Sequence, residues 1–186
     1  MDLDLLAKLK SAEGEAALAA ATRVISRDPL SAATELRAAG IDAALASAAL
    51  TQVRLRQRAS TKFGPDADPL WFTRTGLQQA TRGRVASRRA ARLATSGVIS
   101  VADLGCGIGA DAIAFARAGL RVVAVEKDPL TAAVAQSNMD TLSLPVNVMC
   151  ADVSSTDLSD VDAVFCDPAR RDPGPRSGIV PGCKGA

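Results

Sequence analysis

The feature that most constrains this chain is an apolar run that ends in an acid and continues into a glycine-rich segment, Val101-Ala-Asp-Leu-Gly-Cys-Gly-Ile-Gly-Ala-Asp111. The apolar run predicts a buried strand, and the residues after the glycines predict the start of a helix. Gly105, Gly107 and Gly109 lack side chains, so the backbone between strand and helix can approach a ligand closely. The N–H groups at a helix start favour a phosphate or a carboxylate. The segment therefore predicts a ligand site at the end of a strand.

A second apolar run, Arg121-Val-Val-Ala-Val-Glu126, ends in another acid roughly 20 residues after Asp103. An acid at that interval after a glycine loop accepts hydrogen bonds from the hydroxyls of a ribose. The two runs together predict a pocket for a nucleoside cofactor. Gly105, Gly107 and Ala110 also satisfy the dinucleotide fingerprint, which keeps a nicotinamide-dependent oxidoreductase as an alternative.

The acids of this region favour a different class of enzyme. Asp103 lies two residues before the first glycine, where a negative charge disfavours a pyrophosphate and favours a cationic ligand group. Asp152 and Asp167 follow the next two apolar runs, 145–150 and 161–166. Acidic side chains at these places suit recognition of the adenine edge and of a cationic reacting centre.

From about Val98 to Arg171 these motifs resemble those of the class I methyltransferases, which transfer a methyl group from S-adenosyl-L-methionine. The resemblance implies an α/β fold with a Rossmann-like parallel sheet of seven strands in the order 3-2-1-4-5-7-6. The chain carries the signal for the first four strands, the N-terminal half of that sheet, so we expect an incomplete core. Because the fourth strand would then be an open edge, we expect a truncated gene product.

The resemblance also implies that one group of residues binds the cofactor, namely Asp103, Gly105, Gly107, Gly109, Glu126 and Asp152. Within that group, the first acid and the glycine backbone hold the methionine part, the second acid binds the ribose hydroxyls and the third binds the adenine amino group. Asp167 and Pro168 would line the space between methyl donor and acceptor as catalytic residues. We expect Asp167 to accept a proton or a hydrogen bond from an attacking amino group.

The last motif, Asp167-Pro-Ala-Arg-Arg171, lacks the aromatic residue that stacks on a flipped base, which argues against methylation of adenine or cytosine amino groups. Together with Lys62-Phe-Gly and Trp71-Phe-Thr-Arg-x-Gly-Leu, it is similar to a group of bacterial methyltransferases with a THUMP-like region. That similarity implies an RNA substrate, with Arg74, Arg170 and Arg171 as substrate-binding residues. Trp71 and Phe72 either stack on a base or pack the loop against the domain.

Basic residues gather in the middle of a chain whose net charge is only +2. They are Arg54, Arg56, Arg58, Lys62, Arg74, Arg82, Arg84, Arg88, Arg89 and Arg92. Such a cluster is either a solvated helix face or a surface for nucleic-acid phosphates. It keeps open a third hypothesis, a non-catalytic fragment that binds nucleic acid.

Composition excludes several other chemistries. The chain has no histidine, which excludes a Ser-His-Asp triad, a Cys-His pair and a histidine-ligated metal. Its four cysteines form no Cys-x-x-Cys motif, so we expect reduced thiols, no metal site and a cytoplasmic protein. The acidic start is unlike a signal peptide, and no apolar run approaches the ~20 residues of a membrane span. The oligomeric state stays open.

The chain divides into four parts by its patterns. They are an N-terminal helical subdomain (1–60), a loop and basic helix (61–97), the cofactor-binding core (98–171) and an irregular tail (172–186). In the second part we expect a loop over 61–75 and one helix over 76–94. In the core, apolar runs predict strands at 98–104, 121–126, 145–150 and 161–166, with helices over 111–118 and from 128 to about 139.

Overall fold

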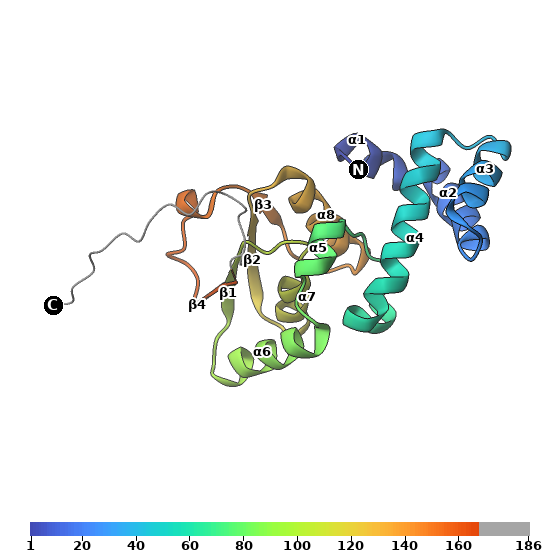
Figure 1. Cartoon of the computed structure of the whole chain (residues 1–186). Coiled ribbons are helices and arrows are strands. Elements are labelled where there is room, and N and C mark those ends of the chain that lie inside the picture. The colour runs from blue at the N-terminus through green and yellow to red at the C-terminus, as the bar shows by residue number, and fades with distance from the viewer. Residues whose placement is uncertain (168–186) are drawn as a thin grey trace, which may run out of the picture.

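The computed structural model describes residues 1–167, so the expected tail at 172–186 lies outside it. Four helices form the N-terminal part: α1 (Leu3–Leu9), α2 (Ala12–Val24), α3 (Pro29–Ala38) and α4 (Ala43–Phe63). Each begins at a side chain that accepts a hydrogen bond from a backbone N–H of the first turn, namely Asp2, Ser11, Asp28 and Asp42. The helices expected from the sequence are present, and Figure 1 shows them packed at one end of the molecule.

The connection between α4 and the sheet differs from the expected loop and single helix. Helix α4 continues to Phe63 and a short 3-10 helix follows at Gly64–Ala67, so part of the expected loop is helical. The expected helix over 76–94 is two helices, α5 (Arg74–Gln79) and α6 (Gly83–Thr95). They separate because Ala80 and Arg82 have extended ψ angles of 135°.

A four-stranded parallel sheet carries the rest of the described chain. It contains β1 (Ser100–Leu104), β2 (Arg121–Glu126), β3 (Val148–Cys150) and β4 (Ala163–Cys166) in the order β3-β2-β1-β4. Helices α7 (Ala110–Arg117) and α8 (Pro129–Thr141) connect the strands, and a short 3-10 helix lies at Val153–Ser155. The expected strand order is confirmed for these four strands. In the parallel register Leu104 pairs with Val125 and Cys166, so the carboxyl ends of the strands meet at one edge.

One apolar cluster runs from the N-terminal helices into the α/β part. Leu9 of α1, Leu45 of α4, Phe115 of α7 and Val134 of α8 are all fully buried within it. The side chain of Lys10 adds a hydrogen bond of 2.9 Å from the end of α1 to Ser137 on α8. The division of the chain at residue 60 stays a prediction, since the buried cluster is continuous across it.

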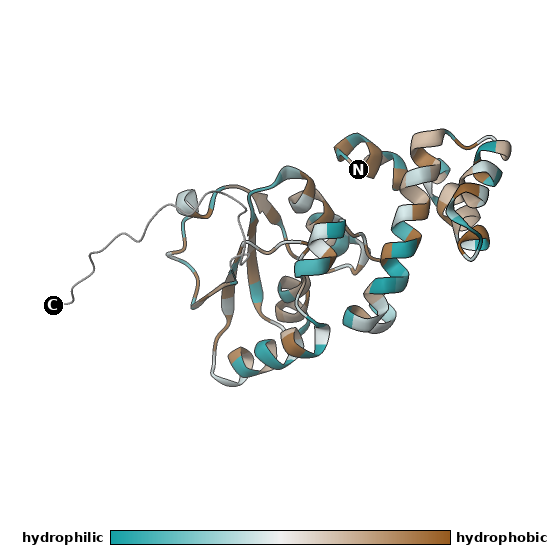
Figure 2. Cartoon of the chain, in the orientation of Figure 1, coloured by the Kyte–Doolittle hydropathy of each residue, from teal (hydrophilic) through white to brown (hydrophobic). Residues whose placement is uncertain are grey.

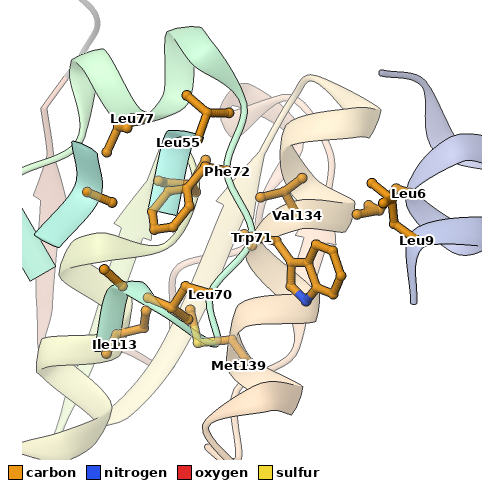
Figure 3. Close-up of a cluster of buried hydrophobic side chains, with 14 of the residues drawn as sticks. Leu6, Leu9, Leu55, Leu70, Trp71, Phe72, Leu77, Ile113, Val134 and Met139 are labelled. Carbon is orange, nitrogen blue, oxygen red and sulfur yellow. The ribbon is translucent and has the colours of Figure 1, made fainter. Parts of the chain in front are cut away.

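The segment between the 3-10 helix and α5 lies inside this cluster. Leu70, Trp71 and Phe72 follow one another among apolar side chains of α4, α7 and α8 (Figure 3). Asn138 accepts a hydrogen bond from the Trp71 N–H (2.7 Å), and its amide group donates to the carbonyl of Trp71 (3.1 Å). Gln52 pairs with the backbone of Phe72 in the same way. The two aromatic side chains therefore pack the segment against the domain.

The surface helices are amphipathic to different degrees. Figure 2 shows hydrophilic and hydrophobic residues alternating along α6, where arginines are interspersed with alanines. Within residues 1–167 no helix is long and apolar enough to span a membrane.

Candidate functional site

A cleft of about 790 Å³ opens at the carboxyl edge of the sheet. Its lining comes from the ends of β1, β2 and β4, from the glycine loop and from α5. The residues are Thr75, Gly76, Gln79, Ala80, Thr81, Asp103, Gly105, Cys106, Gly107, Ile108, Ala110, Asp111, Glu126, Asp128, Thr131, Phe165 and Asp167. Ligands of open α/β sheets bind at this edge.

The loop from Gly105 to Gly109 owes its shape to glycine. Gly105, Gly107 and Gly109 have φ angles of +74°, +58° and +87°, in the left-handed region that other residues avoid. Gly109 is also crowded, because a Cβ atom there would lie 2.5 Å from Cε of Met139 on α8. The loop can therefore present its backbone to the cleft, which Gly105 and Gly107 line, whereas Gly109 is not among the lining residues.

Asp103 is the most unusual group of the cleft. Its residue is only 2% exposed, and its Oδ2 is buried without a hydrogen-bond partner among the described residues. Burial, and then the nearby charge of Asp111, raise the pKa of Asp103 to about 7. A buried carboxyl with an unused oxygen is costly unless a ligand supplies a donor.

Asp111 lies beside Asp103 but has its own cation. Arg89, on α6, donates a hydrogen bond to the carboxylate of Asp111, which stands in the first turn of α7. The Arg89 guanidinium also lies 4.2 Å from the centre of the Phe165 ring. Arg89 therefore contacts two residues that line the cleft, Asp111 and Phe165, and no motif in the sequence predicted these contacts.

Glu126 shapes the glycine loop as well as lining the cleft. Its Oε2 accepts a hydrogen bond of 2.9 Å from the N–H of Gly107, and its Oε1 accepts one of 2.9 Å from the N–H of Asp128. A carboxylate has about four acceptor positions, so two bonds leave room for ligand hydroxyls. Asp128 accepts from the N–H of Thr131 and caps α8.

Asp152 lies outside the lining of the cleft, at the end of β3. Its carboxylate accepts hydrogen bonds from Lys127 (2.8 Å) and from the N–H of Ser154 (3.0 Å). These contacts, first of all the one with Lys127, hold the pKa of Asp152 well below its usual range. Its proposed contact with adenine stays a prediction.

The other expected site residues are scattered. Asp167 is exposed and lines the cleft after β4. Arg74 is exposed at the start of α5 and lines a separate, mostly apolar hollow of about 390 Å³ between α1, α4 and α8. Pro168, Arg170 and Arg171 lie outside the described residues.

Sequence reasoning missed the wall that α5 and the turn after it give to the cleft. Gly76 fits against the glycine loop, because a Cβ atom there would lie 2.3 Å from Cγ2 of Ile108. Gln79, Ala80 and Thr81 complete this wall. A glycine within a short helical pattern was the available signal, since such a glycine often marks close packing.

The described residues contain no group of three or more histidine, cysteine, aspartate or glutamate side chains placed to hold a metal ion. Cys106, Cys150 and Cys166 are free thiols, and burial raises the pKa of the Cys106 thiol in the glycine loop. A raised pKa keeps this thiol neutral and unreactive.

Two protein families match parts of the chain. A family described as a methyltransferase domain matches residues 101–171, and a domain of unknown function (DUF8688) matches residues 2–59. Rv3037c and MT3122, from two strains of Mycobacterium tuberculosis, are uncharacterized S-adenosylmethionine-dependent methyltransferases. Each is 38% identical to this chain over 127 residues, which are 66% of this chain and 34% of the relative. The chain thus spans about a third of the length of these curated relatives.

Solved structures with similar segments include two RNA-directed examples. A candidate RNA methyltransferase, PH1948 of Pyrococcus horikoshii, is 28% identical with a TM-score of 0.46, over 63% of this chain and 59% of that one. The 16S rRNA N2 G1207 methyltransferase RsmC of T. thermophilus, in complex with AdoMet and guanosine, is 27% identical with a TM-score of 0.41. That match covers 56% of this chain and 28% of the other.

The family match contains the glycine loop and both acid-ending strands β1 and β2, which disfavours the oxidoreductase alternative. The curated relatives agree with the family match. Residues 101–171 therefore match a methyltransferase domain, and the curated relatives that the chain resembles are S-adenosylmethionine-dependent methyltransferases.

Proposed function

We propose that the cleft binds S-adenosyl-L-methionine and that the chain is a methyltransferase, or a part of one, whose substrate is RNA. The observation that carries the cofactor assignment is Asp103, whose Oδ2 is buried in the cleft without a hydrogen-bond partner among residues 1–167. The methionine part of the cofactor has an ammonium group, which supplies both a positive charge and N–H donors. Either contribution offsets the cost of burying this carboxyl.

The other residues of the cleft fit the remaining parts of the cofactor. The glycine loop leaves space, since a Cβ atom at Gly105 or Gly107 would meet nothing within 4 Å. Glu126 is held by two backbone N–H groups and keeps free acceptor positions for the ribose hydroxyls. Asp152 remains the candidate for the adenine amino group by family resemblance alone.

When bound, S-adenosyl-L-methionine supplies an already activated methyl group on a positively charged sulfur. The chain's own task is then to hold the acceptor in line and to exclude competing water. Asp167 lies at the cleft and is exposed, so it can accept a hydrogen bond or a proton from an incoming nucleophile. The role of Pro168 rests on the family motif.

The RNA proposal rests on the exposed face of α6 together with the THUMP-like motifs. Arg84, Arg88 and Arg92 are exposed and four residues apart, so they form one stripe along the helix. Helix α6 contains no acidic residue, and within residues 1–167 none of the three arginines forms an ion pair. Such a stripe suits the phosphates of a nucleic acid.

Three other residues of the basic cluster have internal partners. Arg56 donates to the carbonyl of Leu70 and lies over the ring of Trp71, while Lys62 and Arg89 bind carbonyls and Asp111 respectively. The surface that we propose for phosphates therefore contains fewer residues than the basic cluster identified in the sequence.

Calorimetric titration of the 186-residue chain tests the cofactor assignment. We expect micromolar binding of S-adenosyl-L-methionine and S-adenosylhomocysteine, no binding of NAD⁺, and loss of binding in Asp103→Ala. A folded chain that binds NAD⁺ and not the two adenosyl compounds would overturn the proposal in favour of an oxidoreductase.

Salt-dependent binding of a single-stranded RNA tests the substrate class. The double variant R84Q/R88Q should reduce the slope of log K against log salt by about 1.4, since each lost phosphate contact contributes about 0.7. The control variant R23Q/R37Q removes two exposed arginines of the N-terminal helices and should leave the slope unchanged. Equal slopes in both variants would refute the α6 surface, and RNA binding without cofactor binding would favour a non-catalytic fragment.

A further inference from the structure

Lys62 makes an unusual set of contacts at the end of α4. Its ammonium group donates to the carbonyls of Leu77 (2.8 Å), Gln78 (2.9 Å) and Ala80 (2.8 Å). A lysine ammonium has three N–H groups, so each of them has one carbonyl partner. The three carbonyls lie at the end of α5, where a helix leaves its last carbonyls without intrahelical partners. A cation at that end is also favoured by the helix dipole.

The three carbonyls belong to the segment that forms one wall of the cleft. Gln79, the last residue of α5, lines the cleft together with Ala80 and Thr81, which lie between α5 and α6. On the other side, α5 touches the glycine loop through Gly76, which leaves no room for a Cβ atom against Ile108. The short helix is thus held between the end of α4 and the glycine loop.

The Lys62 side chain is partly buried, although a lysine side chain is long enough to reach water. Burial, and then the positive charge of Arg82, lower the pKa of Lys62. Within the described residues its partners are carbonyl groups rather than a carboxylate. The backbone of Lys62 also lies close to Gly83, because a Cβ atom at Gly83 would lie 3.0 Å from the carbonyl oxygen of Lys62. The same residue therefore contacts the end of α5 and the start of α6.

We propose that Lys62 is a positioning residue that holds the α5–α6 turn as a preformed wall of the cofactor cleft. The shape of the cleft then depends on the last turn of the N-terminal helix α4. The proposal rests on the proposed function where it concerns the cofactor, and on the contacts alone where it concerns the turn.

Hydrogen exchange of the ligand-free protein tests the turn. The Leu77 and Ala80 amides bond to the carbonyls of Thr73 and Gly76, so their exchange reports whether α5 stays folded. In Lys62→Met these two amides should exchange about tenfold faster, while amides of α2 and α8 keep their wild-type rates. Arg58→Met is the matched control, since Arg58 is exposed one turn earlier on α4, and it should change neither set.

Binding of S-adenosylhomocysteine, measured by calorimetry, tests the consequence for the cleft. We expect Lys62→Met to bind about tenfold more weakly, which is about 1.4 kcal/mol. Lys62→Arg keeps the charge, but its planar fork matches three separate carbonyls poorly, so we expect an intermediate loss. If wild type itself does not bind, the proposed function fails while the exchange experiment still decides the role of Lys62.

The inference is overturned by wild-type exchange at Leu77 and Ala80 in Lys62→Met, or by faster exchange spread evenly over α2, α4 and α8. Failure of both the methionine and arginine variants to fold would also overturn it, because Lys62 would then support the whole fold. Local loss of protection with weaker binding is the result that supports a positioning role.

Discussion

The ends of β1 and β3 each carry an aspartate that the sequence predicts to bind the cofactor, yet the two surroundings are opposite. Asp103 is 2% exposed, its Oδ2 has no partner within residues 1–167, and its pKa is raised to about 7. Asp152 is exposed, and Lys127 and Ser154 satisfy its carboxylate. The two aspartates thus differ in burial and in hydrogen bonding, although both stand at the carboxyl ends of strands.

The difference separates a group that needs a ligand from one that is complete without it. A buried oxygen without a donor destabilises the free protein. A cationic ligand that donates a hydrogen bond to this oxygen removes that cost, which favours binding. A solvated, ion-paired carboxylate must give up water or Lys127 before it can bind anything else. We therefore expect Asp103 to contribute more to cofactor affinity than Asp152, a difference that their positions in the sequence do not indicate.

The largest effect should come from Asp103→Asn, which keeps the shape of the side chain and removes its charge. We expect the affinity for S-adenosylhomocysteine to fall about 100-fold, since a buried charge-assisted pair is lost. Calorimetry measures the affinity, and circular dichroism checks that the variant folds. An affinity within about threefold of wild type would remove Asp103 from the site.

The pH dependence of stability should show the same residue in the ligand-free protein. Because the folded-state pKa of Asp103 lies above its unfolded value of 3.8, the protonated carboxyl stabilises the fold fully below about pH 4, and this contribution is lost as the pH rises through about 7. Between pH 5 and pH 8 wild type should lose on the order of 2 kcal/mol more than Asp103→Asn in urea unfolding. Parallel pH profiles for the two proteins would contradict the raised pKa.

Glu126→Gln should have an intermediate effect. The amide retains one oxygen acceptor, so either Gly107 or Asp128 loses the bond that its N–H donates to Glu126. We expect about tenfold weaker binding of S-adenosylhomocysteine, the scale of one hydrogen bond to a charged group. Unchanged binding would show that neither the loop contact nor the ribose contact depends on this charge.

Asp152→Asn should have the smallest effect. The variant keeps an acceptor for the Ser154 N–H and loses only an exposed ion pair with Lys127. We expect a change in cofactor affinity of about threefold or less, measured beside Lys127→Met as a control for the pair. A loss above about tenfold in the Asp152 variant alone would establish the adenine contact. It would also contradict the expectation that Asp152 contributes little to cofactor affinity.

The sequence predicted the sheet and its order well because short apolar runs, glycines and capping aspartates are local signals. Strand β2 has the expected bounds, and Asp28 and Asp128 cap helices as their position before proline predicts. The break between α5 and α6 was missed, and at that break Lys62 donates to carbonyls that lie 15 to 18 residues further along the chain. The helix propensities of neighbouring residues do not predict such a tertiary contact.

The site was predicted less completely than the fold. The acids and glycines that line the cleft stand at recognisable intervals, so Asp103, Glu126 and Asp167 were named from spacing and resemblance. The pairing of Arg89 with Asp111 and the wall at Gln79–Thr81 are tertiary contacts between segments with no shared motif. Burial distinguishes Asp103 from Asp152, and burial is a property of the whole packed chain.

Asn138 joins three segments that are far apart in sequence, which bears on the order in which the chain folds. Its amide binds the backbone of Trp71 and the carbonyl of Ile108, across separations of 67 and 30 residues. Contacts of such long range close late, because loop-closure entropy must be overcome first. We expect Asn138→Ala to accelerate unfolding and leave the folding rate nearly unchanged in stopped-flow experiments. An equal slowing of folding would instead place this junction in the nucleus. Through Asn138 the glycine loop is thus connected to the Trp71 segment, which precedes it in the chain.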